Sequence, residues 1–206
     1  MKRLVIFIGV CMLAIVAMAQ QLDARGLLDK ASANLRANEG IQARFQIYTP
    51  QGETNASISL EADSFFLETP GVKTWFDGTT QWTYLEENQE VSVTNPTPEE
   101  LQQINPYALL NTYQSGYDLL LVANNQAKMF HEIRLTAQSE EQSMQRITLM
   151  LNKKTLHPIR IKMKPQGMAE EVDVVVTEYH TKKQFADDFF RFNPASYPQA
   201  EVIDLR

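Results

Sequence analysis

The sequence predicts a mainly β fold with a few helices, of the α+β class, organised around one large antiparallel sheet. Three observations predict it. Apolar and polar residues alternate in short segments along most of the chain. Turn residues separate these segments at fairly regular spacing. Helical periodicity is confined to one segment near the N-terminus and a short pair in the middle, so the helices are few.

The first nineteen residues have the three parts of a secretory signal peptide. Lys2 and Arg3 form a basic start, an apolar run covers Leu4–Val16, and residues 17–19 read Ala-Met-Ala, an A-x-A cleavage site. Cleavage is therefore expected after about Ala19. The alternative is an uncleaved anchor, but the apolar run is shorter than a comfortable membrane span.

The single cysteine, Cys11, lies inside this segment and is preceded by Val10. A lipid-attachment cysteine would follow a small residue later in the segment, so Cys11 is interpreted as an ordinary hydrophobic residue of the signal. The mature chain then has no disulfide and no thiol nucleophile. We expect a protein exported without a lipid anchor, soluble, and periplasmic if the host has two membranes.

Removal of the signal leaves residues 20–206, enough for one domain with a substantial core. Lys plus Arg falls from 19 to 17 against 25 acidic residues, which gives a net charge of −8. This charge argues against nucleic acid or an anionic membrane surface as a partner, because both attract basic patches. No linker, repeat or low-complexity segment divides the chain.

The mature chain begins with an amphipathic helix over 22–37, which Gly40 ends. Its apolar stripe consists of Ala24, Leu27, Leu28, Ala31 and Leu35. Two alternating strands follow, over 41–48 and 56–61. The first places Ile41, Ala43, Phe45 and Ile47 on one side, and the second places Ala56, Ile58 and Leu60 on one side.

Residues 65–94 predict four short strands joined by tight turns. Thr69-Pro70-Gly71-Val72 is typical of a type II turn, and Asp77-Gly78 is a strong hairpin signal. If those two residues are the whole loop, Phe76 pairs with Thr79 and Trp75 with Thr80. Alternation places three large aromatic side chains, Trp75, Trp82 and Tyr84, on one face. They need an apolar surface to lie against, which a core or a lipid would supply.

The pattern changes at Thr97-Pro98-Glu99-Glu100, a capping box that starts a short helix. Asn105-Pro106 repeats the start signal, and Gly116 ends the second short helix. Helices this short are marginal alone and must dock on something. The chain then returns to strands over 130–137, 145–151, 158–164 and 171–182.

A broad sheet curls as it twists. A curled sheet with few helices encloses either an apolar cavity or a filled core, and the filled core is the commoner outcome. The residues alone leave both open.

The sequence offers no recognisable catalytic or metal site. His131, His157 and His180 lie on separate segments without ligand spacing. No nucleophile elbow, phosphate-binding loop or dinucleotide fingerprint occurs. We expect no enzyme activity, no cofactor and no metal, although an unfamiliar lipid-modifying hydrolase is an alternative.

The order of motifs resembles one known family. The motifs are Phe-x-x-Glu-Thr-Pro from Phe65, Trp-Phe-Asp-Gly-x-x-x-Trp-x-Tyr from Trp75, Asn-Pro-x-x-Leu-Leu from Asn105, and Phe-Phe-x-Phe-Asn-Pro from Phe189. Together they are similar to periplasmic outer-membrane lipoprotein carriers of the LolA family, in the branch of Bacteroidetes-like bacteria. The resemblance implies an incomplete, strongly curved antiparallel barrel, closed by helices over an apolar cavity that holds lipoprotein acyl chains.

The resemblance also implies site residues. The cavity lining would comprise Phe45, Ile47, Ile58, Leu60, Phe65, Leu67, Trp75, Trp82, Tyr84, Ile133, Leu135, Ile147, Leu149, Ile161 and Met163. A movable lid would comprise Leu101, Ile104, Tyr107, Leu109, Leu110 and Tyr113. Members of the family have an arginine that binds the lid, just before the four strands that correspond to residues 65–94. Residues 60–66 contain no arginine, so the interaction that closes the lid must differ here.

The resemblance implies a monomeric carrier that takes acylated lipoproteins from an inner-membrane release complex to an outer-membrane acceptor of unknown identity. The alternative is a periplasmic lipid or lipoprotein sensor that regulates a membrane partner. Such sensors usually carry a further domain, and this chain stops soon after Phe192-Asn193-Pro194, which favours the carrier.

Overall fold

The computed structural model describes residues 23–37, 40–97, 100–101, 113–123 and 128–206. The predicted signal peptide lies outside these residues. The chain divides into two compact units: residues 1–34 with 110–171 form the first, and residues 35–109 with 172–206 form the second. The prediction of a single domain stays a prediction, and each unit is described by itself.

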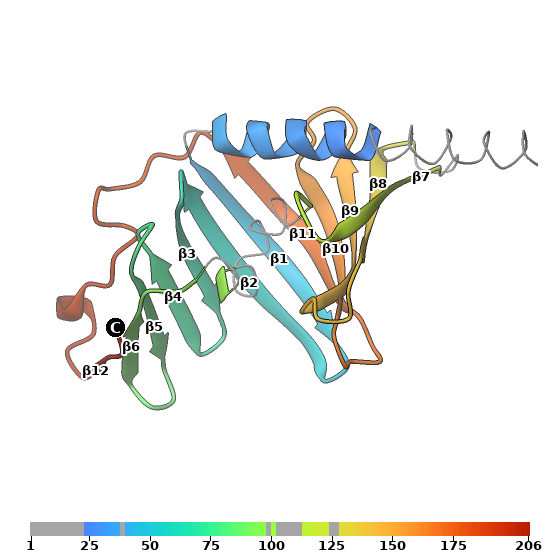
Figure 1. Cartoon of the computed structure of the whole chain (residues 1–206). Helices are drawn as coiled ribbons and strands as arrows, with labels where there is room; N and C mark the ends of the chain where they lie inside the picture. The colour runs from blue at the N-terminus through green and yellow to red at the C-terminus, as the bar shows by residue number, and fades with distance from the viewer. Residues whose placement is uncertain (1–22, 38–39, 98–99, 102–112, 124–127) are drawn as a thin grey trace, which may run out of the picture. The chain divides into compact units, whose positions relative to one another are not determined.

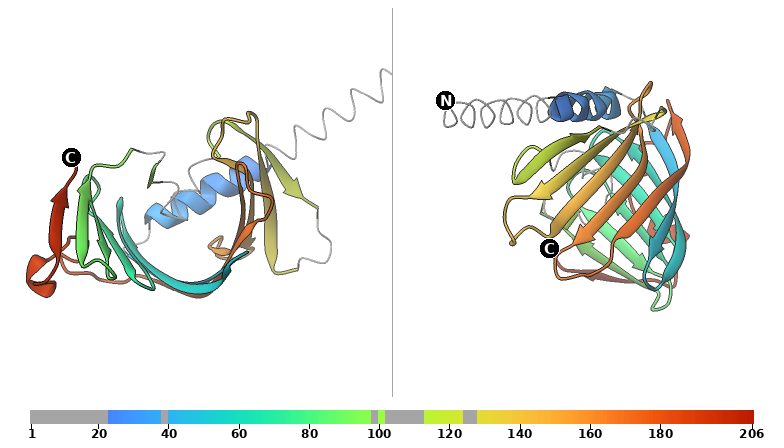
Figure 2. Two further views of the ribbon diagram at one scale, coloured as in Figure 1. Left: turned by 90° about the horizontal axis from the view of Figure 1, so that it is seen from below. Right: turned by 90° about the vertical axis from the view of Figure 1, so that its right-hand side faces the viewer.

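The second unit is a sheet of eight strands in the order β12-β6-β5-β4-β3-β2-β1-β11 (Figure 1). All neighbours are antiparallel except β12, which runs parallel to β6. The strands are β1 (Ile41–Thr49), β2 (Gly52–Glu61), β3 (Ser64–Thr69), β4 (Val72–Phe76), β5 (Gln81–Leu85), β6 (Glu90–Thr94), β11 (Val172–Thr181) and β12 (Glu201–Asp204). Figure 2 shows this sheet curving along its strand order.

A β-bulge interrupts the pairing of β1 with β11. Arg44 pairs with Glu178 whereas the next residue, Phe45, pairs with Val176, so Thr177 is the extra residue. The Thr177 hydroxyl donates a hydrogen bond to the Arg44 carbonyl at 3.2 Å. Bulges of this kind increase local twist and bend a strand, which is consistent with the curvature of the sheet.

Two positions of the backbone depend on glycine, one for its φ angle and one for a close approach as well. Gly71 has a φ of 77° in the turn between β3 and β4, which confirms the predicted type II turn geometry at that position. Gly40, with a φ of 134°, precedes β1, and an added Cβ would overlap the Lys183 carbonyl. A side chain at Gly40 would therefore push β1 away from the segment that follows β11.

The hairpin between β4 and β5 differs from the sequence prediction. Phe76 pairs with Gln81 and Trp75 with Trp82, so the loop comprises Asp77–Thr80 rather than Asp77-Gly78 alone. The Asp77 carboxylate accepts hydrogen bonds from the Thr79 and Thr80 amides at 3.1 and 2.9 Å. This side-chain turn stabilises the longer loop. Because the register differs by two residues, the face of each side chain is the predicted one.

The first unit combines a helix with four antiparallel strands in the order β10-β9-β8-β7. The helix spans 23–37, close to the predicted 22–37, and residues 23–34 of it belong to this unit. Its buried apolar positions, Ala24, Leu28 and Ala31, lie on the predicted stripe, and Ser32 is buried beside them. The strands are β7 (Tyr117–Val122), β8 (Phe130–Ala137), β9 (Met144–Asn152) and β10 (Pro158–Pro165).

Two strands, β7 and β12, have no counterpart among the predicted elements. The same holds for a 3₁₀ helix at Pro194–Ser196, which the side chain of Asn193 caps by accepting from the Ala195 amide at 3.0 Å. In the part of the chain described here, no helix is long and apolar enough to span a membrane.

Candidate functional site

One face of the second unit's sheet is apolar from β11 to the end of β4. We call it the apolar face. The register brings Phe45 opposite Ala56, Ile58 opposite Leu67, and Leu60 opposite Phe65. Its apolar members are Ile41, Ala43, Phe45, Ile47, Ala56, Ile58, Leu60, Phe65, Leu67, Val72, Phe76, Val174, Val176 and Tyr179. All are buried except Ile47, Leu67, Val72, Val176 and Tyr179, which are half-buried.

The opposite face of the same sheet carries the large aromatic side chains, and we call it the aromatic face. Phe66 pairs with Trp75, which pairs with Trp82. Successive residues of a strand point to opposite faces, so Phe65 belongs to the apolar face and its neighbour Phe66 to the aromatic face. Contrary to the prediction, Trp75, Trp82 and Tyr84 therefore do not share a lining with the apolar residues of β1 and β2.

The aromatic face is covered by the chain's own C-terminal segment. The Trp75 ring lies 5.6 Å from both Phe192 and Tyr197, centroid to centroid. Tyr84 lies 4.8 Å from Tyr197, and Phe66 lies 5.8 Å from Phe189 edge to face. These are favourable geometries for aromatic pairs. The aromatic residues thus find their apolar surface inside the protein.

Gln81 is a buried polar residue on the apolar side of the sheet, where Thr74 is also buried. Gln81 pairs with Phe76, so its side chain shares the face of that ring. Gln81 is 8% exposed, and its Oε1 is buried without a hydrogen-bond donor among the described residues. It is not among the predicted site residues, although a glutamine close to the apolar residues of a predicted hairpin is a visible signal.

The first unit has an apolar face of its own. Ile133 pairs with Leu149, and Leu135 with Ile147. The two predicted residues of β10 pair with the same two β9 residues. The six predicted residues from these strands therefore share one face, and all but the half-buried Met163 are buried.

The start of the predicted lid is formed as expected. The Thr97 amide donates to the Glu100 carboxylate at 2.7 Å, and the Glu100 amide donates to the Thr97 hydroxyl at 3.3 Å. This reciprocal pair confirms the capping box. Leu101 follows within the helix and is half-buried. Four predicted lid residues lie outside the described residues, namely Ile104, Tyr107, Leu109 and Leu110.

Tyr113, the last predicted lid residue, is fastened to the N-terminal helix. Its hydroxyl donates to the Asp29 carboxylate, and the Arg25 guanidinium lies 5.8 Å from its ring centroid. Burial, followed by the hydrogen bond to Asp29, raises the pKa of the Tyr113 phenol to about 12. Tyr113 is 2% exposed, so its burial and its contacts with the helix hold it in place within the first unit.

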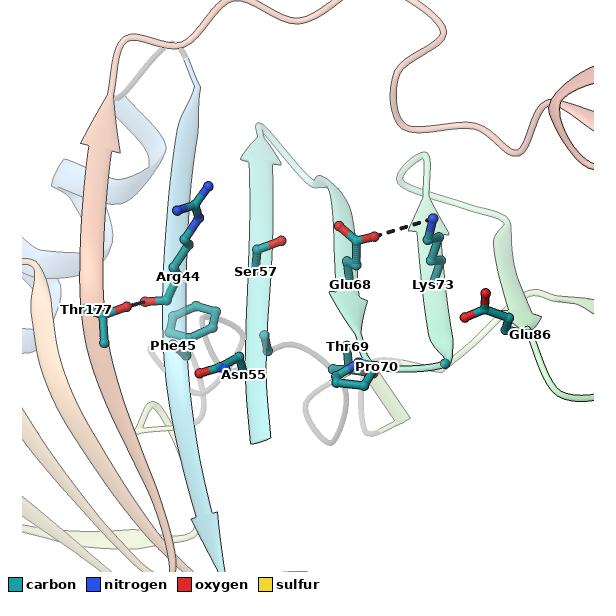
Figure 3. A pocket seen from close by; sticks show the side chains of 12 residues that line it. Arg44, Phe45, Asn55, Ser57, Glu68, Thr69, Pro70, Lys73, Glu86 and Thr177 are labelled. Atoms are coloured by element: carbon teal, nitrogen blue, oxygen red, sulfur yellow. Dashed lines mark hydrogen bonds and ion pairs between the residues drawn. The ribbon is translucent and has the colours of Figure 1, made fainter. Parts of the chain in front are cut away.

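A hollow of about 470 Å³ is lined by a row of polar side chains on the same side of the second unit's sheet as the aromatic face, and also by Phe45 and Ala56 (Figure 3). Arg44, Ser57, Glu68 and Lys73 stand in one row across β1–β4. The Arg44 guanidinium pairs with Glu178 at 3.0 Å, and the Lys73 ammonium pairs with Glu68 at 3.4 Å. A surface of paired charges is unsuited to hydrocarbon.

The histidines do not form a site. Burial lowers the pKa of both His131 and His157, and His180 lies 3.6 Å from the Glu178 carboxylate. Within the described ranges, no group of three or more His, Cys, Asp or Glu side chains could hold a metal ion.

Solved structures with the same fold have little sequence in common with this chain. An uncharacterized conserved protein from Thermus thermophilus has a TM-score of 0.62 and 17% identity, over 88% of this chain and 99% of that one. A DUF1329 family protein from Desulfovibrio piger has a TM-score of 0.51 and 11% identity, over 86% of this chain and 99% of that one. At these identities the likeness shows the fold alone.

A search of curated proteins finds no match. The family comparison is decisive, because residues 15–167, well over half of the chain, match the family described as outer membrane lipoprotein carrier protein LolA. The matched range contains the strands β1 to β10, and therefore most of the apolar face and the whole four-stranded sheet of the first unit. The chain belongs to the outer membrane lipoprotein carrier protein LolA family.

Proposed function

We propose that the protein is a periplasmic carrier that holds the acyl chains of lipoproteins against the apolar face of its second unit. It would receive this cargo from an inner-membrane release complex and deliver it towards the outer membrane, without covalent chemistry. The observation that carries the proposal is the apolar face itself, and membership of the LolA family supports the class of cargo.

The composition of the apolar face suits hydrocarbon. Its side chains from β1, β2 and β3 include no charged residue, whereas the other side of the same strands carries Arg44, Glu68 and several amides and hydroxyls. Phe65 and Phe76 pack with ring centroids 5.3 Å apart, beside the aliphatic residues of β1 and β2. Away from the threonines at the strand ends, a ligand on this face would meet apolar groups over three adjacent strands.

The magnitude of the hydrophobic effect fits a carrier. Each buried methylene contributes about 0.8 kcal/mol, so about ten methylenes contribute about 8 kcal/mol. This corresponds to roughly micromolar affinity before the costs of binding are subtracted. Burial of several complete chains would make release too slow, so a carrier needs either partial burial or a part that opens. The predicted lid that begins at Leu101 stays a proposal for that part, with Tyr113 as its fixed end.

The test uses two neighbouring residues of β1 that point to opposite faces. Ile47 belongs to the apolar face and Gln46 to the polar side, and both are half-buried. Ile47→Asp places a charge where the acyl chain would lie and should lower affinity at least about tenfold. Gln46→Asp places the same charge on the other side and should leave affinity unchanged.

The measurement is native mass spectrometry of each protein purified from the periplasm of its own host. Wild type and Gln46→Asp should carry acylated lipoproteins in one-to-one complexes, and Ile47→Asp should not. Wild-type protein that carries no acylated protein would contradict the carrier. A complex with free lipid alone, or with a membrane regulator, would favour a sensor instead.

A further inference from the structure

The apolar side of the second unit's sheet changes character along the strand order. Over β1–β3 it is mainly hydrocarbon, whereas over β4–β6 uncharged polar groups lie among Val72, Phe76 and Leu85, and Glu90 stands at the start of β6. Thr74 pairs with Thr83, which pairs with Ser92. Gln81 pairs with Phe76 on one side and with Thr94 on the other. Gln81 therefore stands at the border between the apolar face and a strip of hydroxyl groups.

Only one of the two polar atoms in the Gln81 side-chain amide takes part in a hydrogen bond among the described residues. Its Nε2 donates to the Thr83 hydroxyl at 3.2 Å. Its Oε1 is fully buried, and the residues described here provide it with no donor. The neighbouring buried side chain, Thr80, is satisfied, because its hydroxyl donates to Asn95 Oδ1 at 3.2 Å.

An unpaired buried carbonyl is unfavourable, and such groups in native proteins call for an explanation. A ligand that brings an N–H group to Gln81 Oε1 would remove this penalty. The position restricts the ligand further, since the donor must lie next to hydrocarbon that covers Phe76 and Phe65. An acyl or alkyl chain attached through an amide has this arrangement, whereas a chain attached through an ester offers acceptors alone.

We propose that Gln81 selects chains that carry an amide N–H beside the hydrocarbon, and so distinguishes lipoprotein from ester-linked glycerolipid. This inference rests on the proposed function. At the acylated end of a lipoprotein, acyl amide and peptide groups supply N–H donors beside the chains. The ester linkages of a glycerolipid supply none. The carbonyl of Gln81 accepts the hydrogen bond, and the chains extend from it over β3, β2 and β1.

The experiment compares two uncharged probes with the same alkyl chain, N-dodecylacetamide and dodecyl acetate. Each displaces an apolar fluorescent dye from the full-length protein. The amide should bind about three- to tenfold more tightly than the ester, the ratio expected for one additional hydrogen bond. In Gln81→Met, which keeps the length of the side chain but removes the carbonyl, the two probes should bind equally.

The control is Gln42→Met, the same substitution on the polar side of β1, where Gln42 lies opposite Ser59. It should retain the amide preference. Equal affinity of the two probes for the wild-type protein would overturn the inference and leave the carrier intact. An amide preference that persists in Gln81→Met would overturn it also. If neither probe displaces the dye, both the inference and the proposed function are wrong.

Discussion

The two faces of the second unit's sheet are both rich in apolar side chains, yet they differ in the groups that their residues contact. On the aromatic face, Trp75 packs against Phe192 and Tyr197 from the same chain. On the other, the apolar residues of β1–β4 border the Gln81 carbonyl, which is buried and has no donor among the described residues. The comparison teaches that size and aromaticity do not identify a ligand-binding surface. The aromatic face is therefore core, and the proposal that the apolar face holds a ligand rests on its composition and on the Gln81 carbonyl.

The largest expected effect comes from Trp75→Ala, which breaks the packing of the aromatic face. Trp75 is 7% exposed and contacts three aromatic rings. Its truncation should lower the free energy of unfolding by about 3–5 kcal/mol. Denaturant titration measures this loss. Affinity for an apolar probe should stay unchanged under conditions where the variant is folded, and a selective loss of binding would show that the aromatic face holds ligand.

A smaller effect is expected from Tyr113→Phe, which lies on neither face of the second unit. Loss of the hydrogen bond to Asp29 should lower the free energy of unfolding by about 1–2 kcal/mol. Because the folded pKa is raised from 10.0 to about 12, the wild type gains full stability from this group below pH 10. That contribution is lost as the pH rises through 12.

Unfolding curves at several pH values test this. The variant should lack the part of the alkaline destabilisation that falls between pH 10 and 12. An identical alkaline profile for both proteins would mean that the Tyr113 phenol is not held protonated by the fold.

The smallest effect is expected from Thr97→Ala, which removes one side of the capping box. Loss of such a cap is worth about 1 kcal/mol to the helix. The amide of Glu100, which donates to the Thr97 hydroxyl, should exchange with solvent faster. Hydrogen-exchange NMR measures this. Neither face of the sheet should respond, and unchanged exchange at Glu100 would mean that the cap does not stabilise the segment.

Turns and helix caps are predictable from the sequence when the residues that form them lie within a few positions of one another. The turn at Gly71 and the capping box of Thr97 and Glu100 are both formed as predicted. The loop predicted for the β4–β5 hairpin has two residues, whereas the observed loop has four. The Asp77 carboxylate stabilises the longer loop by accepting hydrogen bonds from the amides of Thr79 and Thr80. Competition between a two-residue turn and a side-chain turn depends on three-dimensional geometry, which the residue pattern does not contain.

Long-range features are less predictable. The alternation of residues correctly places Trp75 and Trp82 on one face of the sheet. It does not show whether that face or the opposite one packs against the C-terminal segment. That choice depends on Phe192 and Tyr197, which lie far along the chain. The strand β12 escapes prediction for the same reason, since it has only four residues and its partner, β6, lies in the first half of the sequence. The unpaired carbonyl of Gln81 depends on the positions of all its neighbours, which a residue pattern does not give.

The most direct test of the central claim is methyl NMR with a bound dodecyl chain. The methyl groups of Ile58 and Leu60 report on the apolar face, and those of Val91 and Val93 report on the aromatic face. Our account predicts nuclear Overhauser contacts from the chain to Ile58 and Leu60 and none to Val91 or Val93. Contacts to the two valines instead would show that the ligand displaces the C-terminal segment, and the assignment of the two faces would be wrong.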